Sequence, residues 1–83
     1  MPRKFEPLPD LARRLRMAMT VRDITSADLM RTTTMGSGQI SEYLNGHQEP
    51  GATRIVQMCK ALDVSADFLL GLSDDMNPKK RKG

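Results

Sequence analysis

Length, composition and charge restrict this chain to a small class of proteins. Its 83 residues, 39% hydrophobic and 28% charged, suit one small globular domain and leave little room for a deep catalytic pocket. One Cys excludes an intramolecular disulfide, and one Cys with one His argues against a structural zinc site. No apolar run approaches the ~20 residues of a membrane span, and the N-terminus lacks the apolar stretch of a signal peptide. We therefore expect a cytoplasmic protein that binds no metal and no membrane.

The net charge of +3 comes from the two ends of the chain. Residues 1–20 hold five basic and two acidic side chains, residues 21–50 two and four, and residues 51–83 six and four. Four of the last six basic residues form a terminal run, Lys79, Lys80, Arg81 and Lys82. A basic balance is typical of nucleic-acid binding, but without this run the remaining residues sum to −1. Charge alone is therefore a weak indication.

The first predicted elements are an arm and a helix. Residues 1–9 contain three prolines and are expected to form an extended N-terminal arm. Asp10 is placed to cap a helix that ends near Arg22, because its carboxylate can accept from a free backbone N–H group. The apolar stripe of this helix, at helical spacing, consists of Leu11, Leu15, Ala18 and Met19. Three arginines are predicted to fall outside the stripe, namely Arg13, Arg14 and Arg16.

Thr25 begins the second predicted helix. Thr25 followed three residues later by Asp28 resembles a capping box, with Asp in the place of the usual Glu. Leu29, Met30 and Thr33 would form the short inner face. The threonines at 32–34 predict an early end, because β-branched residues are poor helix formers.

A third helix is predicted from about Ser37 to Leu44. Gly36 is an acceptable N-cap, and Gly46 can take the left-handed conformation that follows many helices. Ile40 and Leu44 would face inward, with Tyr43 partly so. The polar side chains would face outward, namely Ser37, Gln39, Ser41 and Glu42.

Two further helices complete the predicted domain. The fourth has an inward stripe of Ile55, Met58, Cys59 and Leu62. Ser65 caps a fifth, short helix, with Val64 and Leu69 as a hydrophobic staple, and Gly71 ends it. No strand pattern is present, so the sequence predicts an all-α domain of five short helices over residues 10–72. Residues 73–83 are expected to form a flexible basic tail.

The order of these elements resembles the helix-turn-helix layout, in which a tight turn joins two short helices. Within that class, the chain is similar to the Cro and phage-repressor (XRE) family over about residues 11–72. The similarity is carried by residues 40–46, by Pro50 and by residues 60–72. It implies a lambda-repressor-like fold with the helix-turn-helix at about residues 25–45.

The first half of the motif departs from the family pattern. Ser26 stands where the family usually has Gln, and Met30 where it usually has a small residue. Thr33 occupies an apolar position, and Thr34 stands where the turn usually has Gly. Because a β-branched residue at positive φ would be unusual, we expect the turn to be rebuilt, using Gly36.

The resemblance implies which side chains meet double-stranded DNA. The third helix would enter the major groove with Ser37, Gly38, Gln39 and Ser41 at the base-reading positions. Gln39 is the strongest candidate, because its amide can form two hydrogen bonds with adenine. The phosphates would be held by residues at the helix edges, namely Ser26, Arg22, Asn45, Gly46, Thr53 and Arg54.

The leading functional hypothesis is a sequence-specific transcriptional regulator, bacterial or phage-encoded. Its simplest form is a repressor that binds a palindromic operator as a homodimer, because one short helix reads few base pairs. The expected dimer surface consists of Phe68, Leu69 and Leu72.

Two alternatives keep the fold but change the function. A protein-binding module is suggested by the charge of −2 over residues 21–50 and by Ser26 in place of Gln. The other alternative is an antitoxin, which would both bind DNA and neutralise a partner protein. An enzyme is not expected, because the sequence has no nucleophile–base pair, phosphate-binding glycine loop or metal-ligand set. No cofactor is expected for the same reason.

Overall fold

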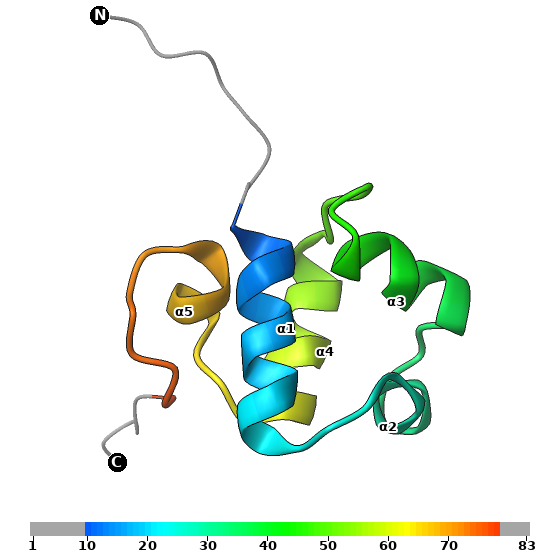
Figure 1. Ribbon diagram of the computed structural model, residues 1–83, viewed down its shortest axis with the longest axis horizontal. Coiled ribbons are helices and arrows are strands. Elements are labelled where there is room, and N and C mark those ends of the chain that lie inside the picture. Colours follow the sequence, from blue (N-terminus) through cyan, green and yellow to red (C-terminus); the bar gives the residue numbers. More distant parts are fainter. Residues whose placement is uncertain (1–9, 79–83) are drawn as a thin grey trace, which may run out of the picture.

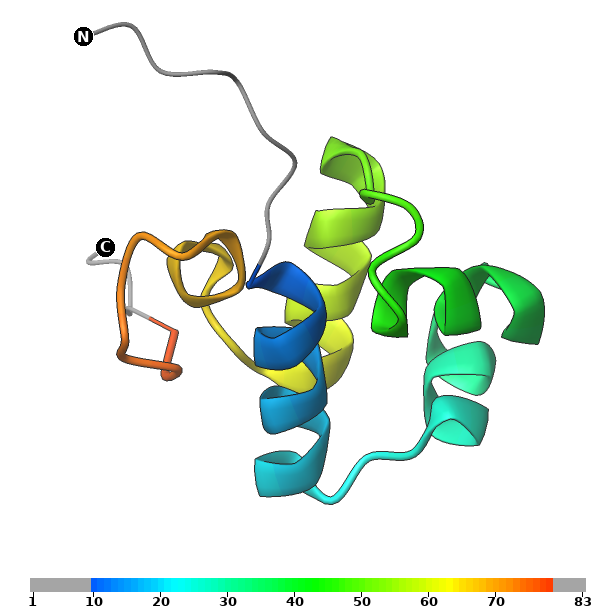
Figure 2. The same cartoon turned by 45° about the horizontal axis from the view of Figure 1, so that its top comes forward.

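A computed structural model describes residues 10–78 of the chain. Within this range it contains five helices and no strand: α1 (Leu11–Arg22), α2 (Ser26–Thr32), α3 (Ser37–Leu44), α4 (Ala52–Leu62) and α5 (Ala66–Leu70). The pair α1 and α4 lies in the middle, with α2 and α3 on one side and α5 on the other (Figures 1 and 2). The predicted all-α architecture of five short helices is confirmed. The predicted arm at 1–9 and the basic run at 79–82 lie outside the described residues.

Local capping follows the prediction at α2 and α5. Thr25 Oγ1 accepts from the Asp28 backbone N–H at 3.2 Å, and the Asp28 carboxylate accepts from the Thr25 backbone N–H at 2.9 Å, so the capping box is complete. Ser65 Oγ accepts from the Phe68 backbone N–H at 3.0 Å. Gly71 ends α5 at a φ of 85°. These short motifs mark where two helices begin and where one ends.

A left-handed aspartate follows each of the two longest helices, α1 and α4. The cap expected at Asp10 is wrong, because its side chain accepts no backbone N–H and instead forms an ion pair with Arg13 at 3.1 Å. After α1, Asp23 lies at a φ of 56°, and after α4, Asp63 lies at 55°. Asp tolerates this left-handed conformation better than most residues with a Cβ. Both helices therefore end without a glycine.

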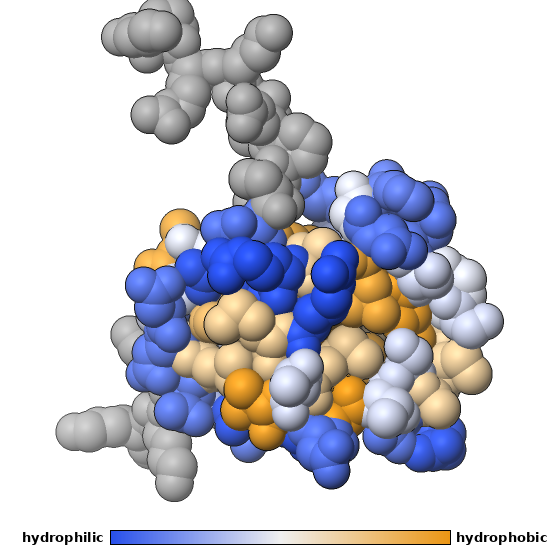
Figure 3. All heavy atoms as spheres, in the orientation of Figure 1, coloured by the Kyte–Doolittle hydropathy of each residue, from blue (hydrophilic) through white to orange (hydrophobic). Residues whose placement is uncertain are grey.

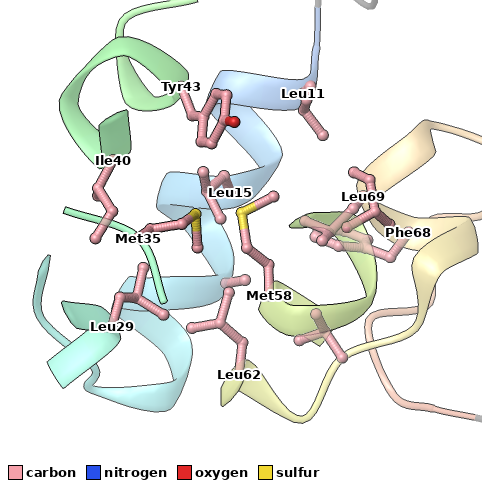
Figure 4. Close-up of a cluster of buried hydrophobic side chains, with 13 residues drawn as sticks. Leu11, Leu15, Leu29, Met35, Ile40, Tyr43, Met58, Leu62, Phe68 and Leu69 are labelled. Atoms are coloured by element: carbon pink, nitrogen blue, oxygen red, sulfur yellow. The ribbon is translucent and has the colours of Figure 1, made fainter. Parts of the chain in front are cut away.

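The hydrophobic core lies where the five helices meet, as Figure 4 shows. It consists of Leu11, Leu15, Ala18, Leu29, Met35, Ile40, Tyr43, Ile55, Met58, Leu62, Val64, Phe68 and Leu69. Each helix supplies at least one fully buried side chain, such as Leu29 from α2 and Leu69 from α5. Burying one such side chain stabilises the fold by roughly 1.5–3 kcal/mol. The core therefore holds α2 and α3 in a fixed place against α1 and α4.

Burial corrects the predicted inner faces of α2 and α3. Met30 is 41% exposed, so the inner face of α2 consists of Leu29 with the half-buried Thr33. In α3, Tyr43 is buried and Leu44 is only half-buried. Since Met30 points outward, its size places no restriction on how closely α2 and α3 pack.

Arg14 departs most from the predicted surface, because it is buried against α5. Its Nη1 donates to the backbone oxygens of Phe68 at 3.0 Å and Ser73 at 2.8 Å. Its Nη2 pairs with Asp74 at 2.8 Å, and its guanidinium lies 4.9 Å from the centre of the Phe68 ring. Arg14 thus stabilises the contact between α1 and the end of α5.

The segment after α5 belongs to the folded domain. The Ser65 backbone N–H donates to the Met76 oxygen at 3.0 Å, and Arg22 Nη2 donates to the Asn77 side chain at 3.2 Å. Met76 also packs against the core. The boundary expected at residue 72 is therefore too early, because side chains from α1 bind residues that the sequence alone marks as a polar tail.

Candidate nucleic-acid interface

The turn between α2 and α3 is closed by threonine side chains. Thr33 Oγ1 donates to the Leu29 oxygen at 2.5 Å and accepts from the Met35 backbone N–H at 3.2 Å. Thr33 itself is extended, at φ −131° and ψ −179°, and Gly36 is the extended N-cap of α3. Positive φ occurs among the described residues only at Asp23, Gly46, Asp63 and Gly71.

The turn was expected to be rebuilt with the help of Gly36, but the Thr33 side chain closes it instead. No residue in it adopts the left-handed conformation, so Thr34 carries no backbone strain and Gly36 is not used for positive φ. Instead, the Thr33 side chain supplies the hydrogen bonds, and Met35 inserts into the core. The turn between the two helices is consequently closed by a threonine side chain at a position where the family pattern has an apolar residue.

The outward face of α3 is polar, as predicted for the base-reading side. Ser37, Gly38 and Ser41 are exposed. A Cβ at Gly38 would meet no atom within 4 Å, so open space surrounds this backbone position. Gln39 is half-buried and its Nε2 donates to the Tyr43 hydroxyl at 3.0 Å. All four predicted residues thus lie on α3, three of them exposed and one held by the core.

A polar cluster joins the turn to the start of α4. Arg54 Nη1 donates to Thr34 Oγ1 at 2.6 Å and to Gln57 Oε1 at 3.1 Å. Gln57 Nε2 also donates to Thr34 Oγ1, at 3.1 Å. Thr53 is exposed one residue before Arg54. The sequence analysis identified Thr53 and Arg54 but missed the contributions of Gln57 and Thr34. The spacing of Arg54 and Gln57 could have revealed their contact, whereas Thr34 reaches them only through the fold.

The loop that leaves α3 contains two further predicted residues. Asn45 and Gly46 are exposed, and Asn45 Nδ2 donates to Ser41 Oγ at 3.3 Å. In Figures 1 and 2, this loop runs from the end of α3 to the start of α4. Asn45 and Gly46 therefore lie at one end of the loop, and Thr53 and Arg54 just beyond the other.

The N-terminus of α2 holds one of the chain's own carboxylates. The backbone N–H and then the hydroxyl of Thr25 donate to Asp28, which lowers the pKa of that carboxyl below its ordinary value of 3.8. Arg31 forms an ion pair with the same carboxylate. Ser26 is half-buried beside this negative group. This environment disfavours a second anion, so the structure gives Ser26 little support as a phosphate ligand.

Arg22 makes its hydrogen bonds with the end of α4 and not with α3. Its Nε donates to the Leu62 oxygen at 3.1 Å, and its Nη2 donates to the Asp63 oxygen at 2.8 Å. These carbonyls lie at the C-terminus of α4, where helices leave acceptors unsatisfied. Arg22 therefore caps α4.

The expected dimer surface is mostly interior. Phe68 and Leu69 are buried in the core of the same chain, so they cannot face a second copy in this fold. Leu72 is 75% exposed. The expectation that all three form a dimer surface is therefore wrong for Phe68 and Leu69. Arg14 and α1 in fact cover two of them.

Residues 10–78 give no support for a metal site, a membrane-spanning helix or a reactive cysteine. No group of three or more potential metal ligands occurs there, and none of the helices is long and apolar enough to cross a bilayer. Cys59 is half-buried, and this burial raises the pKa of its thiol, which makes the reactive thiolate rarer.

Comparison with known proteins identifies the family. A family model described as a Cro/C1-type HTH DNA-binding domain matches residues 14–75. This range includes both helices of the motif, the threonine-closed turn and the segment that Arg14 binds. No curated protein and no solved structure matches the chain. The chain is a DNA-binding protein that belongs to the Cro/C1-type helix-turn-helix family.

Proposed function

We propose that this protein is a repressor that binds a palindromic operator as a homodimer, in the cytoplasm of a bacterium and from a bacterial or phage gene. The observation that carries the proposal is the polar, exposed face of α3, with Ser37, Gly38 and Ser41 at its surface. A helix-turn-helix protein reads DNA with the N-terminal residues of this helix in the major groove. Occupying an operator is sufficient for repression, whereas activation requires a further contact.

Base discrimination would come mainly from Gln39. Its amide can donate to N7 of adenine and accept from N6, and such a pair discriminates against other bases by about 1–3 kcal/mol. The hydroxyls of Ser37 and Ser41 can donate or accept, so they read less selectively. Gly38 would allow the helix backbone to approach the groove closely.

Phosphate contacts would come from the two ends of the loop between α3 and α4. Arg54 is charged and is held in place by Thr34, so it is the strongest of these candidates. Thr53, Asn45 and Gly46 are exposed, although the Gly46 backbone N–H already donates to the Tyr43 oxygen at 3.2 Å. Phosphate contacts of this kind position the protein without reading sequence.

The homodimer is supported by the size of the reading surface. α3 has eight residues and presents four base-reading positions, which is too few for a specific site. Two copies on half-sites one helical turn apart would double the contacts. The exposed Leu72 is the residue of the predicted dimer surface that remains available for such a contact.

The test is selection of bound duplexes from a random pool at about 0.15 M salt. The expected product is an inverted repeat with half-site centres about 10–10.5 base pairs apart. Gln39→Ala should lose the preference at one position in each half-site. Gln48→Ala removes the same amide from an exposed loop and should leave the base preference unchanged. No enrichment by the folded protein would contradict the proposal.

A second candidate is a protein-binding module or antitoxin, and one surface favours it. On the outer side of α1, the exposed Met17 and Val21 line a shallow hollow of about 340 Å³ with Arg13, Arg16 and Thr20. Figure 3 shows apolar atoms there among strongly hydrophilic ones. The salt dependence of DNA binding separates the candidates, because each phosphate contact contributes a slope of about −0.9. A DNA affinity that does not change with salt concentration would favour the protein-binding module or antitoxin.

A further inference from the structure

Tyr43 links the reading face of α3 to the hydrophobic core. Its side chain is only 4% exposed, and Figure 4 shows the ring between α3 and α1, near Leu11 and Leu15. One helical turn earlier, Gln39 Nε2 donates to the Tyr43 hydroxyl at 3.0 Å. Packing alone requires the ring but not the hydroxyl. Packing therefore does not account for the hydroxyl group of Tyr43.

We propose that Tyr43 is a positioning residue that determines base specificity by orienting the amide of Gln39. The proposal rests on the proposed function, in which Gln39 reads a base. A primary amide has two N–H donors and one carbonyl acceptor. When one N–H is given to Tyr43, the other remains beside the carbonyl oxygen. The amide then presents one donor and one acceptor side by side, which is the pattern that adenine complements.

The core makes this orientation rigid. The Tyr43 ring is buried among side chains from α1 and α3, so its hydroxyl oxygen stays in one place. Gln39 is itself half-buried, in contrast to the exposed Ser37 and Gly38. A glutamine without such a partner must lose side-chain freedom when it binds a base, which weakens binding. Here the hydrogen bond to Tyr43 restricts that freedom before DNA arrives.

Tyr43→Phe isolates the hydroxyl, because it keeps the ring. The affinity ratio between a duplex with adenine at the Gln39 position and one with another base should fall by about two- to tenfold, the range for one net hydrogen bond. The salt dependence of binding should not change, because no phosphate contact is removed.

The experiment measures this ratio in four proteins: the wild type, Tyr43→Phe, Gln39→Ala and the double variant. The probes are the duplex selected by the wild type and its copies with one base changed at the position where Gln39→Ala loses preference. If Tyr43 acts through Gln39, adding Tyr43→Phe to Gln39→Ala will have no further effect on the ratio. Ser65→Ala is the control, because it removes a helix cap in α5 and lowers stability without touching α3.

A second measurement does not depend on DNA. In the NMR spectrum of the free wild-type protein, the Gln39 side-chain amide should show one proton protected from exchange, and Tyr43→Phe should abolish that protection. Circular dichroism confirms that the variant is folded.

Two results would overturn the inference, and a third would overturn the proposed function. An unchanged ratio in Tyr43→Phe, with Gln39→Ala clearly impaired, would show that the hydroxyl does not matter. A sharper preference in Tyr43→Phe would show that the hydroxyl withholds Gln39 from the base. A wild-type protein that selects no sequence would instead overturn the proposed function on which the inference rests.

Discussion

The guanidinium of Arg14 pairs with the carboxylate of Asp74 at 2.8 Å, although the two residues are 60 positions apart in the chain. Their surroundings differ sharply, because the Arg14 side chain is 11% exposed and that of Asp74 is 97% exposed. Water competes more for the carboxylate than for the carbonyl oxygens that Arg14 also binds, because the bond to Phe68 is buried and the bond to Ser73 is partly buried. The stabilising effect of Arg14 therefore depends more on those carbonyls than on its ionic partner.

This asymmetry predicts different costs for the two partners. Asp74→Asn should lower the free energy of unfolding by no more than about 1 kcal/mol, as for an exposed ion pair. Arg14→Ala should lower it by about 2–4 kcal/mol, because it removes the Arg14 donor from the carbonyls of Phe68 and Ser73 and uncovers the Phe68 ring, although the Phe68 carbonyl keeps the Gly71 N–H at 3.2 Å. Urea unfolding followed by circular dichroism measures both values. Equal losses would contradict the interpretation.

Acid should remove the contribution of Asp28 to stability. The pKa of its carboxyl is lowered in the folded state by the backbone N–H and hydroxyl of Thr25. A lowered pKa stabilises the fold above the unfolded value, near 3.8, and this effect disappears as pH falls through the folded value. Asp28→Asn mimics the neutral acid, so it should be less stable than the wild type at pH 7.

The comparison is made by thermal unfolding between pH 7 and pH 2. The stability difference between wild type and Asp28→Asn should stay constant down to about pH 4 and then shrink as the carboxyl is protonated. Asp75→Asn serves as a control, because Asp75 is exposed in the segment after α5 and takes no part in the capping box. A difference that persists at the lowest pH would mean that Asp28 acts through its shape and not its charge.

Arg54 should contribute to DNA binding without contributing to sequence preference. Arg54→Ala should weaken binding to all duplexes by a similar factor and reduce the magnitude of the salt slope by about 0.9, the value for one phosphate contact. Fluorescence anisotropy across a salt series measures this. Lys60→Ala removes an exposed positive charge from the other end of α4 and should change the slope less. A change in base preference in Arg54→Ala would instead show that Arg54 contacts a base in the major groove.

Leu72 should be required for self-association. Leu72→Asp places a charge on the exposed apolar residue that remains from the predicted dimer surface, so it should raise the dimer dissociation constant by at least tenfold. Sedimentation equilibrium gives the constant. Val56→Asp is the matched control, because Val56 is also exposed and apolar but lies on α4. If Leu72→Asp dimerises like the wild type, the dimer surface lies elsewhere.

Sequence patterns predicted the parts of this fold that depend on a few consecutive residues. The capping box of Thr25 and Asp28, the cap at Ser65 and the end at Gly71 each rest on contacts within four positions. The bounds of α3 were predicted for the same reason. Local patterns were not always sufficient, because the cap predicted at Asp10 did not form.

The contacts that connect distant segments could not be predicted in this way. Arg14 was predicted to fall outside the apolar stripe, although it lies three positions after Leu11 and four before Ala18, a spacing that places it on the buried face. Its partners become visible only when the segment after α5 returns to α1. The contact of Thr34 with Arg54 spans 20 positions and likewise requires the packed core.

The hydrogen bond between Arg22 and Asn77 affects where the protein is best attached to a sensor chip. It holds the last described residues beside α1, on the side of the molecule away from α2 and α3 (Figures 1 and 2). A sensor chip coupled to the protein at Asn77 or Pro78 would therefore leave α3 facing the solution. Immobilisation at this end should preserve access for long duplexes, whereas coupling through the loop between α3 and α4 should obstruct them.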